Sequence, residues 1–307
     1  MRPPRIAAIV NPRSATGKTG RRWPDLASSL PALDVRFTQG PRHATELARE
    51  CLREGYERII AVGGDGTINE VVNGFLIDGR PINREAVLSI LPLGTGSDFQ
   101  KSLGIESLDD AIKLIGHERP SPIDIGRVEY QSPEGRREAR YFANVVSFGM
   151  GGEVAARAKN LVSKVSGKGA FLLATAQVFL SYRPKTAELT VDGQSYGPFT
   201  ITNIAIGNGR YHGGGMHVCP KALLDDGELE VTVIEALSSF ELIRDIKTLY
   251  SENLYLHPKT HHMRGSRISA RSGQLVSIEV DGEPLGALPL DFSVVPGAIR
   301  VARRVGQ

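Results

Sequence analysis

The segment Val62-Gly-Gly-Asp-Gly-Thr-Ile-Asn-Glu70 places three glycines, an acid and a hydroxyl between an apolar run and a stretch of helical composition. At a strand-to-helix junction, free backbone N–H groups and the positive end of the helix dipole can bind a phosphate. The glycines let phosphate oxygens approach the backbone closely. Thr67 can cap the helix, and Asp65 offers a carboxylate that a metal ion could bridge to phosphate oxygens. A plain glycine turn is the alternative interpretation.

A second glycine loop, Leu91-Pro-Leu-Gly-Thr-Gly-Ser-Asp-Phe99, also follows an apolar run that predicts a strand. Loops at the carboxyl ends of successive parallel strands lie side by side, where open α/β sheets bind ligands. Two such loops favour a nucleotide site, although neither has the G-x-G-x-x-G fingerprint. Gly17-Lys18-Thr19 does not end a P-loop, because Pro12 stands where the first glycine is required. The loop from Asn11 to Lys18 either contacts phosphates or is a solvated surface loop.

An acidic glycine turn lies in the second half of the chain, after the glycine cluster Ile206-Gly-Asn-Gly-Arg210. Asp225, Asp226 and Glu228 flank this turn. Carboxylate and carbonyl oxygens at such a turn can hold a hard cation. An ordinary acidic turn explains the same residues equally well.

The segment Val280-Asp-Gly-Glu-Pro284 places two carboxylates, Asp281 and Glu283, around a tight turn. One of them could accept a proton from a hydroxyl group as a general base. An Asp-Gly hairpin turn is the alternative, and it is the commoner meaning of this dipeptide.

The elements that must position these motifs divide the chain at about residue 122. Before it, apolar runs predict strands that alternate with helical stretches, which indicates an α/β domain with a parallel sheet. The strands are expected at 5–11, 34–38, 58–62 and 86–91, and the helices at 22–30, 44–54, 67–76 and 108–115.

Residues 123–307 are rich in predicted strands, and turn dipeptides such as Asp192-Gly193 favour an antiparallel arrangement. Strands are expected at 123–130, 140–148, 187–191, 200–207, 229–234, 276–280 and 292–295. The last of these could return to the first domain. Helical stretches are expected at 152–182, in pieces, and at 238–253. In the latter, one apolar face is predicted to contain Leu242, Ile243, Ile246, Leu249 and Tyr250.

Composition excludes several classes of protein. With 307 residues, 41% hydrophobic and 23% charged, the chain can bury a core, so it is neither a disordered chain nor a collagen. Its longest apolar run, residues 170–180, is too short to span a bilayer. We expect no secretion signal, and the two cysteines fit a reducing cytoplasm. Aromatic residues make up only 6% and are not interleaved with basic ones, which argues against a nucleic-acid partner.

Taken together, the motifs resemble those of the bacterial diacylglycerol-kinase-like soluble lipid kinases, which belong with the NAD kinases to one superfamily. The resemblance covers most of the chain in the family's order. It is carried by Gly63-Gly-Asp-Gly-Thr-Ile-Asn-Glu70, Leu91-Pro-Leu-Gly-Thr-Gly-Ser-Asp98, Ile206-Gly-Asn-Gly-Arg210, Cys219-Pro-Lys-Ala-Leu-Leu-Asp-Asp-Gly227 and Val280-Asp-Gly-Glu-Pro284. It implies an N-terminal three-layer α/β nucleotide-binding domain at 1–122, and an antiparallel β-sandwich-like domain with helical insertions at 123–307.

The resemblance also implies roles for individual residues. Glu283 would be the proton acceptor, with Asp281 beside it. A structural Mg²⁺ would be held by Asp226 and the backbone carbonyls of Leu223 and Glu228. ATP would contact Thr38, Gly64, Asp65, Gly66, Thr67, Ile68, Asn69, Glu70 and Thr95. Ser97 stands where many members have Asn, so it keeps a hydroxyl but lacks the amide.

We therefore expect an ATP-dependent lipid kinase that uses Mg²⁺ and docks transiently on the membrane surface, either alone or as a homodimer. The basic N-terminal region or residues 159–171 could supply the membrane contact. An NAD kinase-like phosphotransferase and a non-catalytic nucleotide sensor are the alternatives. The acceptor could be diacylglycerol, phosphatidylglycerol, a sphingoid base or another hydroxylated lipid, and the hairpin at 131–140 has no assigned role.

Overall fold

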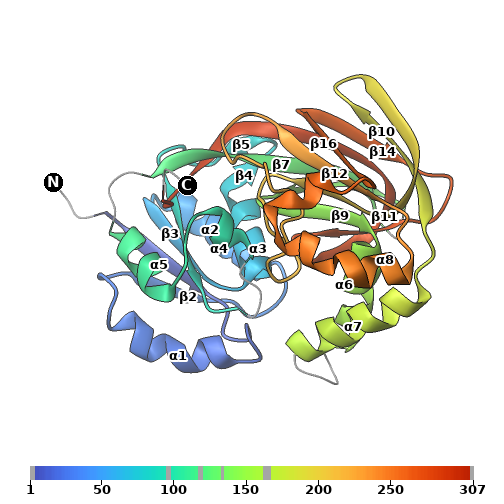
Figure 1. Ribbon diagram of the computed structural model, residues 1–307. Coiled ribbons are helices and arrows are strands. Elements are labelled where there is room, and N and C mark those ends of the chain that lie inside the picture. The colour runs from blue at the N-terminus through green and yellow to red at the C-terminus, as the bar shows by residue number, and fades with distance from the viewer. Residues whose placement is uncertain (1–3, 95–97, 117–119, 133–134, 162–166, 305–307) are drawn as a thin grey trace. The chain divides into compact units, whose positions relative to one another are not determined.

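A computed structural model describes residues 4–94, 98–116, 120–132, 135–161 and 167–304 of the chain (Figure 1). The chain forms two compact units. The first unit comprises residues 1–125 and 295–307, and the second unit comprises residues 126–294. Each unit has its own arrangement of strands, which positions one part of the predicted chemistry.

The first unit contains a parallel sheet in the order β6–β3–β1–β2. Every residue of β1 is buried, as is typical of parallel strands covered on both faces. Beside β6, Arg300 and Val301 of the last strand add a further parallel pairing. The strands are β1 (Ile6–Val10), β2 (Asp34–Phe37), β3 (Arg58–Gly63) and β6 (Val87–Pro92), with a small hairpin of β4 (Leu76–Ile77) and β5 (Arg80–Pro81).

Helices connect these strands, so the α/β class predicted for the N-terminal part is confirmed. They are α1 (Lys18–Ala27), α2 (His43–Arg53), α3 (Asp65–Phe75), α4 (Asp98–Ser102) and α5 (Leu108–Ile115). Helix α2 buries one face with the spacing of an amphipathic helix, through Ala44, Leu47, Ala48, Cys51 and Leu52. Gly74 on α3 lets the two helices approach, because a Cβ atom there would lie 2.5 Å from the Cβ of Ala48.

The second unit is rich in antiparallel strands, as predicted. Strand β11 pairs with β10, β12 and β9, and β15 joins β9 to β16. The strands are β7 (Ser121–Gln131), β8 (Arg137–Phe142), β9 (Val145–Gly149), β10 (Lys185–Val191), β11 (Gln194–Gly207), β12 (Leu229–Glu235), β13 (Thr260–Gly265), β14 (Arg267–Arg271), β15 (Ser277–Val280) and β16 (Glu283–Val301).

Side chains from most of these strands form one apolar core, which includes Phe142, Phe148, Ile204, Val231 and Leu290. The ring of Phe142 meets that of Phe292 edge-on, with centroids 6.3 Å apart. The residue opposite Phe142 on β7 is Gly126, where a Cβ atom would lie 2.1 Å from the Phe142 ring. A glycine is therefore needed at position 126 for the ring to reach the core.

Three differences from the predicted elements are informative. The strand predicted at 140–148 is in fact two strands, β8 and β9, with a break at residues 143–144. Strands β13 and β14 were not predicted. The helix predicted at 238–253 ends early, because α8 (Ser239–Asp245) is followed by two 3₁₀ turns, η1 (Ile246–Tyr250) and η2 (Glu252–Leu256).

This change of helical period overturns the single apolar face predicted for 238–253. Leu242 and Leu249 line a cavity inside the unit, whereas Ile243 and Tyr250 are 63% and 52% exposed. The remaining helices of the second unit are α6 (Met150–Leu161) and α7 (Gly167–Ser181), which replace the stretch predicted at 152–182. In the described part of the chain, no helix is both long and apolar enough to cross a bilayer.

Candidate functional site

The two glycine loops lie next to each other in the first unit, at the carboxyl ends of the neighbouring strands β3 and β6. The carbonyl oxygen of Gly63 accepts hydrogen bonds from the backbone N–H groups of Leu93, at 2.9 Å, and Gly94, at 3.0 Å. The predicted meeting of these loops is therefore confirmed as far as Gly94. Thr95 and Ser97 lie outside the described residues.

Helix α3 begins at Asp65, with Gly64 in extended conformation at its N-cap position. Thr67 lies inside the helix and the N-cap residue is Gly64, which has no side chain, so the capping role predicted for Thr67 is wrong. Instead, the hydroxyl of Thr67 accepts a hydrogen bond from Nδ2 of Asn11, at 3.0 Å. The first backbone N–H groups of a helix have no acceptor within the helix, which leaves this end suited to an anion.

The loop after β1 contacts the same two glycine loops. Its Asn11 contacts α3 through Thr67, and the hydroxyl of Thr19 donates to the carbonyl of Leu93, at 3.3 Å. Arg13 and Lys18 are exposed on this loop. The structure thus brings three strand-end loops together, with two cations on one of them. Hydrogen bonds therefore connect the loop after β1 to both glycine loops, and a phosphate contact by residues 11–18 stays a prediction.

The acidic side chains of the first motif hold helices in place. The carboxylate of Asp65 accepts hydrogen bonds from the backbone N–H groups of Asp98 and Phe99, at the start of α4. The carboxylate of Glu70 accepts from those of Arg42, at 2.9 Å, and Ala44, at 3.1 Å, at the start of α2. These carboxylates neutralise helix N-termini, which stabilises both helices.

The other predicted nucleotide residues of the first unit are mostly buried. Ile68 and Asn69 are 2% and 1% exposed, and Nδ2 of Asn73 donates to the side chain of Asn69 at 3.2 Å. Thr38 follows β2, and its backbone N–H donates to the carbonyl of Val10. Gly64 and Gly66 are partly accessible. In this arrangement, the backbone around residues 64–67 is the part of the motif that a phosphate could reach.

In the second unit, the two carboxylates of the Asp-Gly-Glu turn have different surroundings. Asp281 is buried, and its carboxylate accepts hydrogen bonds from three consecutive backbone N–H groups, those of Ala143, Asn144 and Val145. This contact explains the break between β8 and β9. Glu283 is 41% exposed at its side chain, and its Oε2 lies 2.7 Å from Nη2 of Arg140. Only the second carboxylate is accessible.

A polar contact between the buried Glu279 and the partly buried His212 adjoins this turn. The Oε2 atom of Glu279, on β15, accepts a hydrogen bond from the N–H of Gly282 at 2.6 Å. Its Oε1 atom lies 3.1 Å from Nε2 of His212. Sequence reasoning missed both residues and Arg140. An acid within the apolar run Val276–Val280 was the available signal, since a buried acid needs a partner.

The glycine cluster at 206–210 adjoins the same place. The Nδ2 atom of the buried Asn208 donates to the carbonyl of Ala143 at 3.0 Å, and its N–H donates to that of Asn144 at 2.8 Å. The segments 143–145, 206–212 and 279–283 therefore form one hydrogen-bonded network around the exposed Glu283. These segments are far apart in the sequence, and their meeting makes the turn a candidate catalytic element.

The side chains predicted to hold Mg²⁺ have contacts with other residues of the protein. The carboxylate of Asp226 pairs with Arg264 and also accepts a hydrogen bond from the N–H of Glu228. Glu228 lies 3.4 Å from the same guanidinium, and Leu223 is exposed. The described residues contain no cluster of three or more His, Cys, Asp or Glu side chains that could bind a metal. The Mg²⁺ assignment stays a prediction.

The buried carboxylate of Glu230 contacts the segment that begins with Cys219. The N–H of Lys221 donates to Oε1 of Glu230 at 3.0 Å, and the hydroxyl of Tyr255 donates to the same oxygen. Burial raises the pKa of Glu230 and, together with the charges of Lys221 and Arg264, lowers that of His262, which stacks on Tyr255. Burial also raises the pKa of Cys219, so its thiol is protonated and unreactive at neutral pH. These contacts stabilise the segment.

Two family models match the chain. Residues 5–128 match the diacylglycerol kinase catalytic domain, and residues 144–303 match the YegS C-terminal NAD kinase beta sandwich-like domain. The chain is 32% identical to the protein named "Probable lipid kinase YegS-like" from Pseudomonas putida (strain KT2440), across 94% of this chain and 89% of that protein. Its namesake from Pseudomonas aeruginosa (strain PAO1) is 33% identical across 88% and 84%.

Solved structures share the fold. A diacylglycerol kinase from Bacillus anthracis str. Sterne superimposes with a TM-score of 0.68 at 22% sequence identity, covering 98% of this chain and 97% of its own. Another structure from that organism superimposes with a TM-score of 0.73 at 24% sequence identity, with the same coverage of both chains. The fold agrees with the matched models and relatives over nearly the whole chain. The chain therefore belongs to the diacylglycerol-kinase-like family of lipid kinases.

Proposed function

We propose that this protein is an ATP-dependent lipid kinase that transfers the terminal phosphate of ATP to a hydroxyl group of diacylglycerol or a related lipid. The observation that carries the proposal is the pairing of the two glycine loops through the Gly63 carbonyl, at the edge where parallel sheets bind ligands. Phosphoryl transfer depends mainly on positioning and on neutralising charge. Adjacent loops rich in backbone N–H groups supply both.

In this proposal, the nucleotide phosphates lie against the backbone of residues 64–67. Arg13 and Lys18 add positive charge from the loop after β1. Asp65 and Glu70 support the site indirectly, because their carboxylates hold the starts of α4 and α2. Thr38 and Thr95 keep the nucleotide contacts that the family resemblance assigns to them.

Glu283 is the proposed general base, because its carboxylate is accessible whereas that of Asp281 is occupied by three backbone N–H groups. As the lipid hydroxyl oxygen bonds to the terminal phosphorus, the bond from that phosphorus to the bridging oxygen of ADP breaks. The hydroxyl proton passes to Glu283, and ADP leaves with the electron pair of the broken bond.

Mg²⁺ enters this proposal as the counter-ion of ATP, where it would neutralise phosphate charge. The carboxylates of Asp65 and Asp226 already have hydrogen-bond or ion-pair partners within the protein. We therefore assign no reaction step to a metal held by this chain.

The acceptor is dissolved in a bilayer, so the protein has to contact a membrane surface, which we propose to be transient and on the cytoplasmic side. Both cysteines are buried as free thiols, which is compatible with a reducing compartment. A homodimer is compatible with the same function.

A radiolabelled-ATP assay over a panel of lipid acceptors, with and without Mg²⁺, tests the function. Glu283→Gln should lower kcat by about 100-fold or more, the usual contribution of a general base. The matched control is Glu188→Gln, an exposed glutamate on β10, which should leave kcat unchanged. NADP formation without lipid phosphorylation would indicate the NAD kinase alternative, and ATP binding without turnover would indicate a nucleotide sensor.

A further inference from the structure

An apolar surface lies on the short helical segment that follows β12. Four large apolar side chains are mostly exposed there, which is unusual for so short a segment. They are Phe240 (73% exposed), Ile243 (63%), Tyr250 (52%) and Leu256 (80%). We refer to these four residues as the 240–256 surface.

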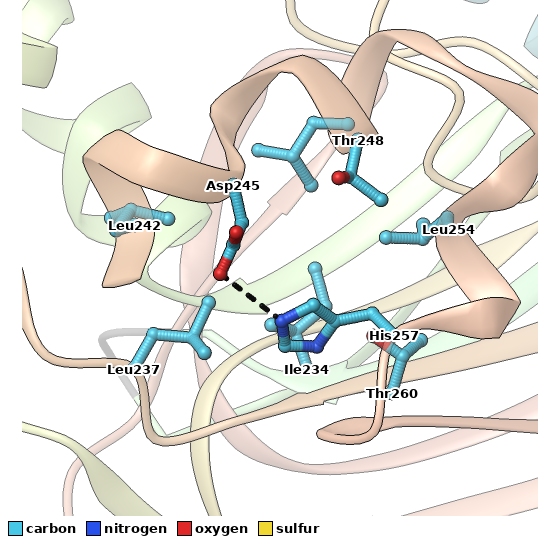
Figure 2. A pocket seen from close by; sticks show the side chains of 9 residues that line it. Ile234, Leu237, Leu242, Asp245, Thr248, Leu254, His257 and Thr260 are labelled. Carbon is cyan, nitrogen blue, oxygen red and sulfur yellow. Dashed lines mark hydrogen bonds and ion pairs between the residues drawn. The ribbon is translucent and has the colours of Figure 1, made fainter. Parts of the chain in front are cut away.

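The opposite side of the segment is anchored firmly to the second unit (Figure 2). Leu242, Leu249 and Leu254 line a cavity of about 20 Å³ over Ile234 of β12. In the same cavity, Nε2 of His257 lies 3.3 Å from Oδ2 of Asp245. The segment already has an apolar contact of its own, so the exposed residues are not needed to hold it in place.

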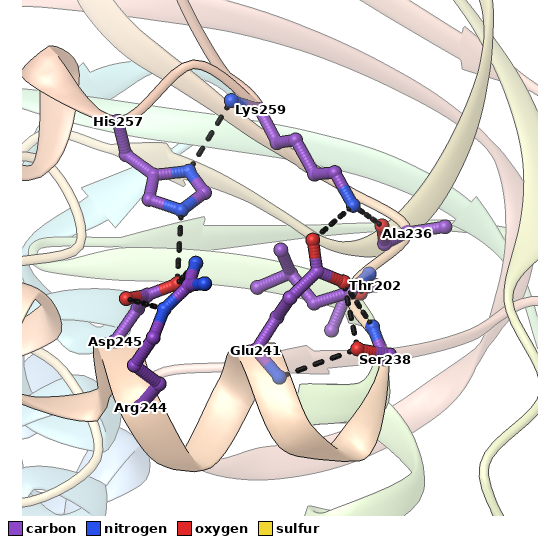
Figure 3. A network of polar contacts seen from close by, with 9 residues as sticks. Thr202, Ala236, Ser238, Glu241, Arg244, Asp245, His257 and Lys259 are labelled. Carbon is purple, nitrogen blue, oxygen red and sulfur yellow. Dashed lines mark hydrogen bonds and ion pairs between the residues drawn. The ribbon is translucent and has the colours of Figure 1, made fainter.

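Polar contacts fix which side of α8 faces the protein (Figure 3). Glu241 accepts hydrogen bonds from Nζ of Lys259, at 2.6 Å, and from the N–H of Ser238, at 2.8 Å. Successive helical residues are 100° apart, so Glu241, Leu242 and Asp245 share one face. Phe240 and Ile243 then lie on the opposite face. The exposure of these two residues follows from the helix geometry.

The charged side chains of the segment are divided between the same two sides. Glu241 and Asp245 face the protein, where contacts with Lys259 and Arg244 hold each pKa at about 2, so both stay ionised and paired. Arg244 is exposed, but its guanidinium pairs with both carboxylate oxygens of Asp245. The exposed Lys247 is matched by the exposed acid Glu252. The outward side is therefore mainly apolar with nearly balanced charge, which suits burial of apolar area at a lipid–water interface.

We propose that the 240–256 surface is the membrane-docking surface of this protein, with Phe240, Ile243, Tyr250 and Leu256 entering the interfacial region of a bilayer. A bilayer suits it better than a second copy of the chain. A stable protein interface takes about 20–30 residues on each side, whereas this surface has four apolar residues on one short segment. Binding to a bilayer scales with the apolar area that is buried, so it sets no such minimum number of residues.

This inference rests on the proposed function, because a lipid kinase has to bind the membrane that contains its acceptor. The 240–256 surface is different from the basic N-terminus and from residues 159–171. Docking would depend mainly on burial of apolar area, with at most a small contribution from the charge of Lys247. We therefore expect binding that responds only moderately to salt.

The experiment compares Phe240→Ser, Ile243→Ser and the double variant with Leu275→Ser, a control at another exposed leucine (76%) in the same unit. Sedimentation with vesicles of phosphatidylcholine and phosphatidylglycerol should show at least tenfold weaker binding for the double variant and wild-type binding for the control. Phosphorylation of bilayer diacylglycerol should fall in parallel. Phosphorylation of a short-chain, water-soluble diacylglycerol should be unchanged, which also shows that the variant is folded.

A second measurement uses the fact that Trp23 is the chain's only tryptophan and is buried. In the variant Phe240→Trp, the emission of the introduced tryptophan should shift to the blue when vesicles are added. In Leu275→Trp, the emission should not shift. Vesicle binding that is unchanged in the double variant would overturn the inference, as would a dimer in analytical ultracentrifugation that Ile243→Ser dissociates. If the wild-type protein phosphorylates no lipid, short-chain or bilayer, it is the proposed function that fails.

Discussion

The Nη2 atom of Arg140 lies 2.7 Å from the Oε2 atom of Glu283, and the arginine side chain is only 16% exposed. A half-buried pair of this kind is less screened by water than a pair on the open surface. Arg140 belongs to β8, which forms a hairpin with β7. A hairpin without an assigned role in the sequence therefore orients the carboxylate proposed to accept the proton.

Arg140→Met should lower kcat for lipid phosphorylation by about 10-fold or more, because a misplaced catalytic group loses alignment with its substrate. The KM for ATP should change little, since Arg140 is assigned no contact with the nucleotide. Arg140→Lys keeps the charge and should recover part of the activity. Steady-state kinetics of these variants and of Arg136→Met, a control on a more exposed arginine, check the prediction. Equal losses at both positions would contradict it.

Asp281→Ala should destabilise the protein by about 3 kcal/mol or more, because three buried N–H groups would lose a charged acceptor. Asp281→Asn should cost less, since one oxygen remains. Urea unfolding of both variants, beside Glu252→Ala at an exposed position, measures these differences. A stable Asp281→Ala protein that had lost only its activity would show that Asp281 takes part in the chemistry.

Glu70→Ala should lower the free energy of unfolding by about 1 kcal/mol, the usual effect of removing a group that caps a helix N-terminus. The affinity for ATP should be changed much less than the stability, because the Glu70 carboxylate faces α2. Urea unfolding and titration with a fluorescent ATP analogue separate the two effects. A large loss of ATP affinity at unchanged stability would place this side chain in the nucleotide site.

The contribution of Glu241 to stability should disappear in acid. Its pKa is lowered from the ordinary value of 4.5 to about 2 by the hydrogen bond from Lys259 and by contacts with Ser238. A carboxylate whose pKa is lower in the folded state stabilises the protein above its unfolded-state pKa, and this effect is lost as pH falls toward the folded-state pKa. Glu241→Gln should thus be destabilising at pH 7 and progressively less so between pH 4.5 and 2. Urea midpoints at several pH values test this, and a difference independent of pH would refute it.

The features that the sequence predicted well depend on residues close together in the chain. The apolar runs before Gly63 and before Leu93 predict two parallel strands, and the glycines after them predict loops at one edge. The same local signals predicted the strand-rich second half. No long-range information was needed for either.

The contacts that define the site depend on residues far apart in the chain. The carboxylate of Asp65 binds backbone groups 33 and 34 residues away, and Arg140 reaches Glu283 across 143 residues. Local patterns do not contain such partners, so the sequence indicated a metal-binding role for Asp65. The pairing of Asp226 with Arg264 of β13 was missed for the same reason, since β13 itself was not predicted.

Strand β16 is 19 residues long, and its last residues complete the sheet of the first unit by pairing with β6. During synthesis, β6 leaves the ribosome about 200 residues before Arg300 and Val301, the residues that it pairs with. Its open edge is a place where a nascent chain could associate with other strands. The half of the protein that holds the glycine loops therefore reaches its final form only after nearly all of the other half has been translated.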